Sequence, residues 1–261
     1  MRLINTHTLQ MEEFFDVGRP KYAILSHRWR DGEVLLQDMQ DIARASIKAG
    51  FAKIQRTCEQ AIADGFDYVW VDTCCIDKTS SVELGEAINS MFRWYRDSSI
   101  CYAYLWDVTD NTIDNDHENN QVQSSDWFSR GWTLQELIAP SRLSFYGQNW
   151  QYLGSKDSIC ELLAQATGID EDTLKGASLR NSSIAQKMFW ASKRQTTRIE
   201  DTAYCLLGIF DIYIPLIYGE GEQAFQRLQE EIIKRSTDHT IFAWHLDSPI
   251  QHGLLADRRR L

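Results

Sequence analysis

The 261-residue sequence lacks the patterns of secreted and membrane proteins. No window approaches 18 consecutive apolar residues, and the N-terminus has no apolar signal core. We therefore predict neither a membrane span nor a secretory signal. The six cysteines form no Cys-x-x-Cys pair, and the histidine spacing offers no zinc pattern. Because these cysteines lie in apolar or helical runs, we interpret them as buried free thiols in a reducing compartment, the cytoplasm.

The signatures of nucleic-acid binding and of redox cofactors are also missing. The net charge of −10 repels phosphate backbones, and the one dense basic run, residues 258–260, follows an apparent domain end. Gly219 and Gly221 lack the third glycine and the strand–turn–helix context of a dinucleotide fingerprint. No Gly-x-Ser-x-Gly elbow occurs. We expect no nucleic-acid partner, no metal and no bound cofactor.

What the sequence does contain indicates a soluble globular α/β protein. Hydrophobic residues make up 43% and charged residues 25% of the chain, and its nine tryptophans supply core area as well as pocket walls. Strands are predicted at 22–26, 67–71, 100–105 and 142–146, and helices between them at 34–48, 51–64, 83–96 and 127–139. This alternation predicts a parallel sheet with right-handed crossovers, flanked by helices.

The second part of the chain is predicted to be mostly helical. Helices are expected at 155–167, 182–193, 199–209 and 219–235, and a short strand at 240–244. Residues 107–126 are rich in acidic and amide side chains without apolar periodicity, so a solvated loop is expected there. We predict an α/β core at residues 1–148, a helical extension of the same domain at 149–245, and a tail or linker at 246–261.

Polar clusters follow the predicted strands, and in a parallel sheet the carboxyl ends of the strands meet at one ligand-binding edge. Those clusters are residues 26–29, residues 72–78, Asp107 and the helix that carries Glu136. On that helix, capped by Ser129 and ended before Pro140, Trp132 and Glu136 stand four apart and share one face. A carboxylate against an indole is partly desolvated, which raises its pKa and makes it a candidate for acid–base or charge-stabilising work. The alternative is a surface glutamate on an amphipathic helix.

Other candidates at this edge carry their own alternatives. Cys75 near His27 is a possible nucleophile–base pair, or both are core residues. Asp72 and Asp77 are either site residues or turn-formers. Three side chains are candidates to hold phosphates: Arg28, Lys78 and Arg130. The alternative is that they form ordinary surface ion pairs.

The chain resembles the fungal heterokaryon incompatibility (HET) domain, of the type found at the N-terminus of fungal NOD-like receptors. The motifs that carry the resemblance lie at 25–29, 70–78, 83–91, 130–137, 204–210 and 218–228. The resemblance implies a cytosolic effector that triggers programmed cell death after non-self recognition. Such effectors are joined to a nucleotide-binding oligomerisation module and a repeat sensor, and the chain resembles the effector alone.

HET domains are also regarded as distant relatives of Toll/interleukin-1 receptor (TIR) domains. The spacing from Ser129 through Trp132 to Glu136 is similar to a TIR stretch whose glutamate is catalytic in NAD-cleaving members. Residues 72–78 stand where TIR domains have a glycine-rich loop. The resemblance implies a flavodoxin-like, TIR-like fold that cleaves NAD as a substrate and is active as a homo-oligomer.

On this hypothesis Glu136 is the catalytic anion and Asp72 orients a ribose or a water molecule. The expected substrate-binding residues are Ser26, His27, Arg28, Trp29, Cys75, Asp77, Lys78, Arg130 and Trp132. Two alternatives stay open. In the first, the domain is a non-enzymatic module that kills by assembly and recruitment of partners. In the second, the same site hydrolyses a different nucleotide.

Overall fold

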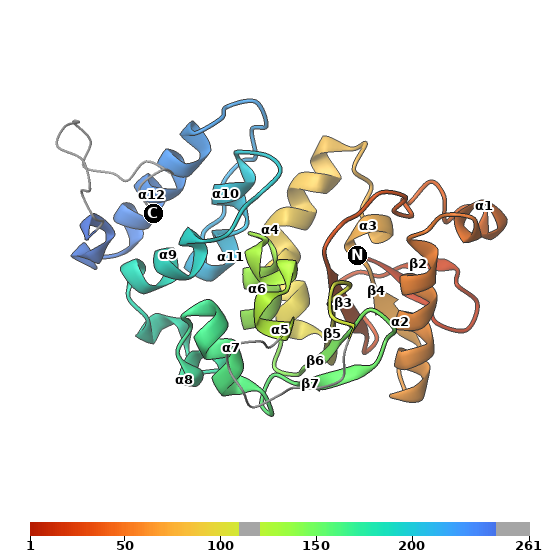
Figure 1. The fold of residues 1–261 in the computed structure, drawn as a ribbon. Coiled ribbons are helices and arrows are strands. Elements are labelled where there is room, and N and C mark those ends of the chain that lie inside the picture. The colour runs from red at the N-terminus through yellow and green to blue at the C-terminus, as the bar shows by residue number, and fades with distance from the viewer. Residues whose placement is uncertain (110–120, 244–261) are drawn as a thin grey trace.

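The computed structural model describes residues 1–109 and 121–243 (Figure 1). Its centre is a seven-stranded sheet in the order β2-β1-β4-β3-β5-β6-β7. The strands are β1 (Arg2–Asn5), β2 (Met11–Glu13), β3 (Ala23–His27), β4 (Tyr68–Trp70), β5 (Ile100–Tyr104), β6 (Leu143–Tyr146) and β7 (Tyr152–Ser155). The four central strands β4, β3, β5 and β6 are parallel, and β1, β2 and β7 are antiparallel to their neighbours.

The predicted α/β fold with a largely parallel sheet is confirmed. In chain order the four parallel strands lie as 2-1-3-4, which is the flavodoxin-like order. The chain moves from β3 outward to β4 and then crosses back to β5, so the strand order reverses between β3 and β5. A crevice forms at such a switch point, outside the carboxyl ends of the strands. The antiparallel strands β1, β2 and β7 were not predicted. Each has only three or four partly buried residues, and this is too short for an apolar pattern to be recognised.

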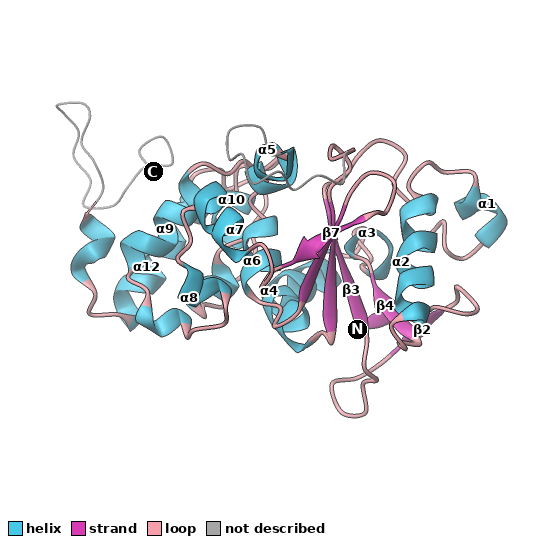
Figure 2. Ribbon diagram, turned by 60° about the horizontal axis from the view of Figure 1, so that its bottom comes forward, coloured by secondary structure: helices cyan, strands magenta, loops and turns pink. Residues whose placement is uncertain are grey.

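Helices cover both faces of the sheet, with α1 and α2 on one side and α4 and α6 on the other (Figure 2). The helices of this part are α1 (Ile42–Ser46), α2 (Phe51–Ala63), α3 (Asp72–Cys75), α4 (Ser81–Asp97), α5 (Gln121–Ser124), the 3₁₀ turn η1 (Asp126–Ser129) and α6 (Thr133–Ile138). The helix predicted at 34–48 is shorter, because Asp41 caps its first turn only there. Ser80 caps the N-terminus of α4, and its hydroxyl accepts the Glu83 N–H.

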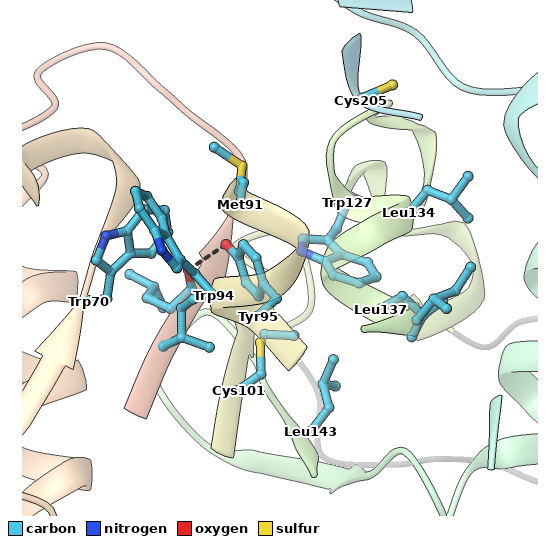
Figure 3. Packing of buried hydrophobic residues seen from close by; sticks show 14 of the residues in the cluster. Trp70, Met91, Trp94, Tyr95, Cys101, Trp127, Leu134, Leu137, Leu143 and Cys205 are labelled. Carbon is cyan, nitrogen blue, oxygen red and sulfur yellow. Dashed lines mark hydrogen bonds between the residues drawn. The ribbon is translucent and has the colours of Figure 1, made fainter. Parts of the chain in front are cut away.

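The core lies between the sheet and this second helical layer. Trp94 and Tyr95 of α4 pack edge-on against Trp70 of β4, with ring centroids 5.6 and 5.8 Å apart. Figure 3 shows these rings in the core, and the Tyr95 hydroxyl donates to the Leu25 carbonyl at 3.0 Å. All six cysteines are buried and free, which confirms the prediction of buried free thiols.

The helix predicted at 127–139 is broken in two. Ser125, and not Ser129, caps η1, while the Ser129 hydroxyl donates to the Asp126 carbonyl. The break falls at Gly131, whose N–H donates to the Gln195 carbonyl at 2.8 Å and thereby ties this segment to the C-terminal part. An added Cβ at Gly131 would lie 2.5 Å from the Thr196 methyl, so the close approach requires glycine.

The C-terminal part is mostly helical, as predicted. Its elements are α7 (Cys160–Thr167), α8 (Glu171–Leu174), η2 (Leu179–Asn181), α9 (Ile184–Ser192), α10 (Asp201–Tyr204), α11 (Leu207–Phe210), α12 (Gln223–Arg235) and η3 (His239–Phe242). The strand predicted at 240–244 is wrong, because residues up to Phe242 form the 3₁₀ turn η3 and residue 244 lies outside the described residues. The predicted helix 199–209 is two short helices, α10 and α11. The predicted tail 246–261 and most of the loop predicted at 107–126 also fall outside the described residues, although α5 occupies part of that loop.

α11 packs directly on α4, so the helical part continues the layer that covers the sheet (Figure 1). No helix in residues 1–109 or 121–243 combines the length and the apolar character needed to cross a bilayer.

Candidate functional site

A cavity of about 320 Å³ lies at the carboxyl edge of the parallel strands, beside the switch point between β3 and β5. Its volume is within the range of small-molecule sites. On the sheet side its polar lining is His27, Trp29, Asp72, Lys78 and Glu136. Arg130, Trp132 and Thr133 come from the start of α6 and the segment before it. The opposite wall is formed by Thr197, Arg198, Asp201 and Tyr218 of the C-terminal part.

Glu136 projects from α6 and is only 6% exposed. The Ser26 hydroxyl, at the end of β3, donates to Glu136 Oε2, and Ser26 Oγ in turn accepts the Trp127 indole N–H at 2.9 Å. Burial, and secondly the charge of Asp72, raise the pKa of Glu136 to about 8, against the opposing effect of Ser26. The predicted rise in pKa is confirmed, and the alternative of a surface glutamate is wrong.

The tryptophan linked to Glu136 differs from the one predicted. Trp127 reaches Glu136 through Ser26, whereas Trp132 is the residue before α6 and directs its hydrogen bonding to Asp201. Trp132 still lines the same cavity as Glu136. The prediction failed on this point because it assumed a continuous helix through Trp132, and the chain is helical only from the next residue.

Asp72 opens α3 and lies at the rim of the cavity. Its Oδ2 accepts the Trp29 indole N–H at 2.6 Å, which fixes the orientation of that half-exposed ring. Lys78 places its ammonium nitrogen 3.3 Å from the centre of the Trp29 ring, and burial lowers the pKa of Lys78. The two polar segments predicted to meet at the strand ends therefore do so here.

His27 is fully enclosed behind Asp72, with its side chain 1% exposed. Its Nδ1 is 3.7 Å from Asp72 Oδ1 and its Nε2 is 3.7 Å from Glu33 Oε1, while Lys53 pairs with Glu33. Burial, and then the charge of Lys53, lower the pKa of His27. Although burial opposes it, hydrogen bonding and charge from His27 and Lys53 lower the pKa of Glu33 to about 2. Glu33 and Lys53 were not predicted, and their spacing carries no motif.

The remaining predicted residues lie outside the cavity lining. Arg28 pairs with Asp126 at 2.5 Å. Asp77 forms a turn in which its Oδ1 accepts the Thr79 N–H and hydroxyl at 3.0 and 2.6 Å, as its alternative interpretation expected. Cys75 is buried and its sulfur accepts the Val71 N–H at 3.4 Å, which favours the core interpretation over a nucleophile. Ser26 lies beneath Glu136.

The wall formed by the C-terminal part was missed entirely. Asp201 accepts the Tyr218 hydroxyl at 2.9 Å. Arg198 stacks over the Tyr218 ring with its guanidinium carbon 4.4 Å from the ring centre. The one available signal was the Tyr-Gly-Glu-Gly motif that begins at Tyr218, which marks a special turn without showing what it faces.

The described residues contain no cluster of three or more His, Cys, Asp or Glu side chains suited to a metal ion. The three carboxylates of the cavity are instead interleaved with the cations of Lys78, Arg130 and Arg198. Such a lining suits a polar molecule that carries charges of both signs.

Sequence comparison shows which protein family the chain belongs to. The family model for the heterokaryon incompatibility protein (HET) matches residues 22–116, and a model for a domain of unknown function (DUF8212) matches residues 223–258. The chain is 48% identical over 221 residues to the vegetative incompatibility protein HET-E-1 of Podospora anserina. This alignment covers 82% of the chain but 16% of that relative. No solved structure matches the chain significantly. The family-model match and the identity to HET-E-1 together show that the chain belongs to the heterokaryon incompatibility (HET) family.

Proposed function

We propose that this domain hydrolyses NAD at the nicotinamide–ribose bond. The observation that carries the proposal is Glu136, a buried carboxyl with a raised pKa that opens onto a cavity at the switch point of a parallel sheet. Perturbed carboxyls in clefts are typical of catalytic sites, and a buried anion that faces no cavity would have no such use.

The lining accommodates each part of a dinucleotide. The nicotinamide ring stacks on Trp132, the residue before α6, which places the bond to ribose near Glu136 of α6. Asp72 faces the ribose hydroxyls or the attacking water. Arg130 and Arg198, at the exposed side of the cavity, hold the diphosphate.

The reaction needs little from the protein beyond a placed negative charge. The C1′–N bond breaks with its electron pair on the nicotinamide nitrogen, which leaves a neutral ring and a positively charged ribosyl centre. A water oxygen then bonds to C1′ and releases one proton, so the products are nicotinamide and ADP-ribose. Glu136 as an anion stabilises the ribosyl cation in a water-poor site, where such stabilisation is largest.

Substrate binding itself promotes the anionic form of Glu136. With a pKa of about 8, this carboxyl is mostly protonated at pH 7 in the empty site. NAD carries a positive charge on its nicotinamide ring, and a cation beside a buried carboxyl lowers the pKa of that carboxyl. The group therefore ionises where and when the positive centre develops.

The biological setting follows from the family. The relative in Podospora anserina is a vegetative incompatibility protein, and the chain spans 16% of its length. We infer that this domain is a cytoplasmic cell-death effector of fungal non-self recognition. It works with NOD-like receptor modules, in the same chain or in a partner, and its NAD hydrolysis is switched on in a homo-oligomer.

The test is nicotinamide release by the purified domain at high concentration, run beside Glu136→Gln. The substitution keeps shape and removes the charge, and we expect release to fall by about 10²-fold or more. Asp77→Asn is the matched control, because Asp77 lies in a turn outside the lining and its change should leave release intact. Release by Glu136→Gln at the wild-type rate would rule out the catalytic role of Glu136. Cell killing by that variant at wild-type strength would instead identify an assembly module.

A further inference from the structure

Asp201 is a carboxylate of the cavity to which the proposed reaction assigns no part. It is the first residue of α10 and faces the cavity from the wall opposite the sheet. The Tyr218 hydroxyl donates to it at 2.9 Å, and the Trp132 indole lies close enough to favour its charged form. Both of these neighbours are neutral, so they do not cancel the charge of the carboxylate.

The neighbouring turn holds Tyr218 firmly in place. Gly219 and Gly221 adopt φ of 103° and 64°, which side chains rarely allow. Their N–H groups donate to the buried Glu200 carboxylate at 2.8 and 3.1 Å. On the other side of Tyr218, the Ile217 N–H donates to the Tyr204 hydroxyl at 2.9 Å. The Tyr-Gly-Glu-Gly turn thus presents one hydroxyl to Asp201, and through Asp201 it fixes the indole of Trp132.

This arrangement puts a negative charge at the edge of an indole whose ring lines the cavity. A flat cation that stacks on an indole is attracted by the ring itself, and tryptophan is the strongest such partner. A carboxylate beside the ring adds a second attraction that an uncharged ring of the same shape does not feel. Arg198 lies over the Tyr218 ring, and its positive charge weakens this attraction without abolishing it.

We propose that Asp201 makes the ring seat on Trp132 selective for a cationic aromatic ring over its uncharged counterpart. The identification of that ring as nicotinamide rests on the proposed function. Asp201 would then favour the oxidised dinucleotide, whose ring is a pyridinium, over the reduced one, whose ring is neutral. Once the bond to ribose has broken, the ring is neutral and its attraction to Asp201 is lost, which favours the release of nicotinamide.

The probes are the two rings alone, the 1-methylnicotinamide cation and neutral nicotinamide, titrated into the domain by calorimetry. Wild-type protein should bind the cation about tenfold more tightly. Asp201→Asn should lose most of this preference and keep only the attraction of the indole itself, and Asp201→Glu, which keeps the charge, should restore the preference. Arg198→Ala, a change at an exposed side chain, should increase the preference, and this variant tests the idea even if Asp201→Asn fails to fold.

Equal binding of the two rings by wild-type protein, or an unchanged ratio in Asp201→Asn or Arg198→Ala, would overturn the proposal. Because no bond is cleaved in this measurement, the two proposals fail separately. If the protein shows a charge preference that depends on Asp201 but leaves NAD intact, the role of Asp201 is supported and NAD hydrolysis is contradicted. If the protein cleaves NAD without that preference, NAD hydrolysis is supported and the role of Asp201 is contradicted.

Discussion

Glu136 and Glu200 are each only 6% exposed, yet their surroundings shift their pKa values in opposite directions. Glu200 accepts two backbone N–H groups, from Gly219 and Gly221, which lower its pKa although burial opposes them. Glu136 accepts one serine hydroxyl, and burial together with the charge of Asp72 raises its pKa to about 8. Glu200 thus sits in a turn that satisfies its charge, and Glu136 sits at a cavity that does not.

The difference separates a structural carboxylate from one for which a catalytic role is proposed. A buried anion with several N–H donors stabilises the fold, so its charge is retained for folding. A buried carboxyl with few donors is held in its neutral form and destabilises the fold whenever it ionises. Such a group persists only where its charge has another use, and Glu136 opens onto the cavity where that use is proposed.

The largest expected effect is a rise in stability when Glu136 is replaced by Gln. A carboxyl whose folded-state pKa lies above its ordinary value of 4.5 loses folding stability as pH rises from 4.5 to about 8. Gln cannot ionise, so the free energy of unfolding of the variant should increasingly exceed that of wild type across this pH range. The difference should be on the order of 4 kcal/mol at pH 8 and above. Urea denaturation at pH 5, 7 and 9 measures the gap, and a gap that is constant with pH would contradict the assigned pKa.

Glu200→Gln should have the opposite sign and a smaller size. Charge-assisted hydrogen bonds are stronger than neutral ones, so the loss of charge against two N–H donors should cost about 2 kcal/mol at pH 7. Because the pKa of Glu200 is lowered, its contribution is present above pH 4.5 and is lost as pH falls through the folded-state value. Urea denaturation extended from pH 5 down to pH 3 should therefore show the deficit of this variant closing. A stabilised Glu200→Gln would remove the contrast between the two sites.

The sequence predicted the surroundings of Glu136 better than those of Glu200. The strands that carry the sheet wall are short, fully buried apolar runs, and β3 is buried at every position. Polar residues at the ends of such strands must meet, so Asp72, Lys78 and Glu136 were found together. What failed there was local, since a helix broken at Gly131 sends Trp132 toward Asp201 and leaves the contact with Ser26 to Trp127.

The opposite wall could not be predicted because no periodic pattern links it to the sheet. Asp201 lies in an ordinary amphipathic stretch, and its carboxyl reaches the cavity only because α11 packs on α4 and residues 195–196 pair with Gly131. Gly208 makes that packing possible, since an added Cβ would lie 2.1 Å from the Phe92 Cβ. Contacts of this kind depend on side-chain volume over more than a hundred residues of separation, and sequence spacing does not encode them.

The pH profile of NAD cleavage tests whether the reaction requires Glu136 as an anion. If the anion of Glu136 is required, kcat/KM should rise about tenfold per pH unit below pH 8 and level off above it, because kcat/KM reports the free enzyme. The profile of kcat should bend at lower pH, since the bound cationic ring lowers the pKa of this carboxyl. Stopped assays of nicotinamide from pH 5 to 9.5 give both curves. A kcat/KM that falls with pH across this range would assign Glu136 as an acid instead.

The smallest effect is expected from Ser26→Ala, which removes the serine hydroxyl that donates to Glu136. That hydrogen bond favours the anion, so without it the pKa of Glu136 should rise and the bend in kcat/KM should move up by about one pH unit. The rate at pH 7 would then drop by up to about tenfold, while the plateau at high pH would be almost unchanged. Trp127→Phe removes only the N–H that donates to Ser26, at 2.9 Å, and should move the bend in the same direction by less. A lower plateau with an unmoved bend would mean that Ser26 positions substrate and does not tune Glu136.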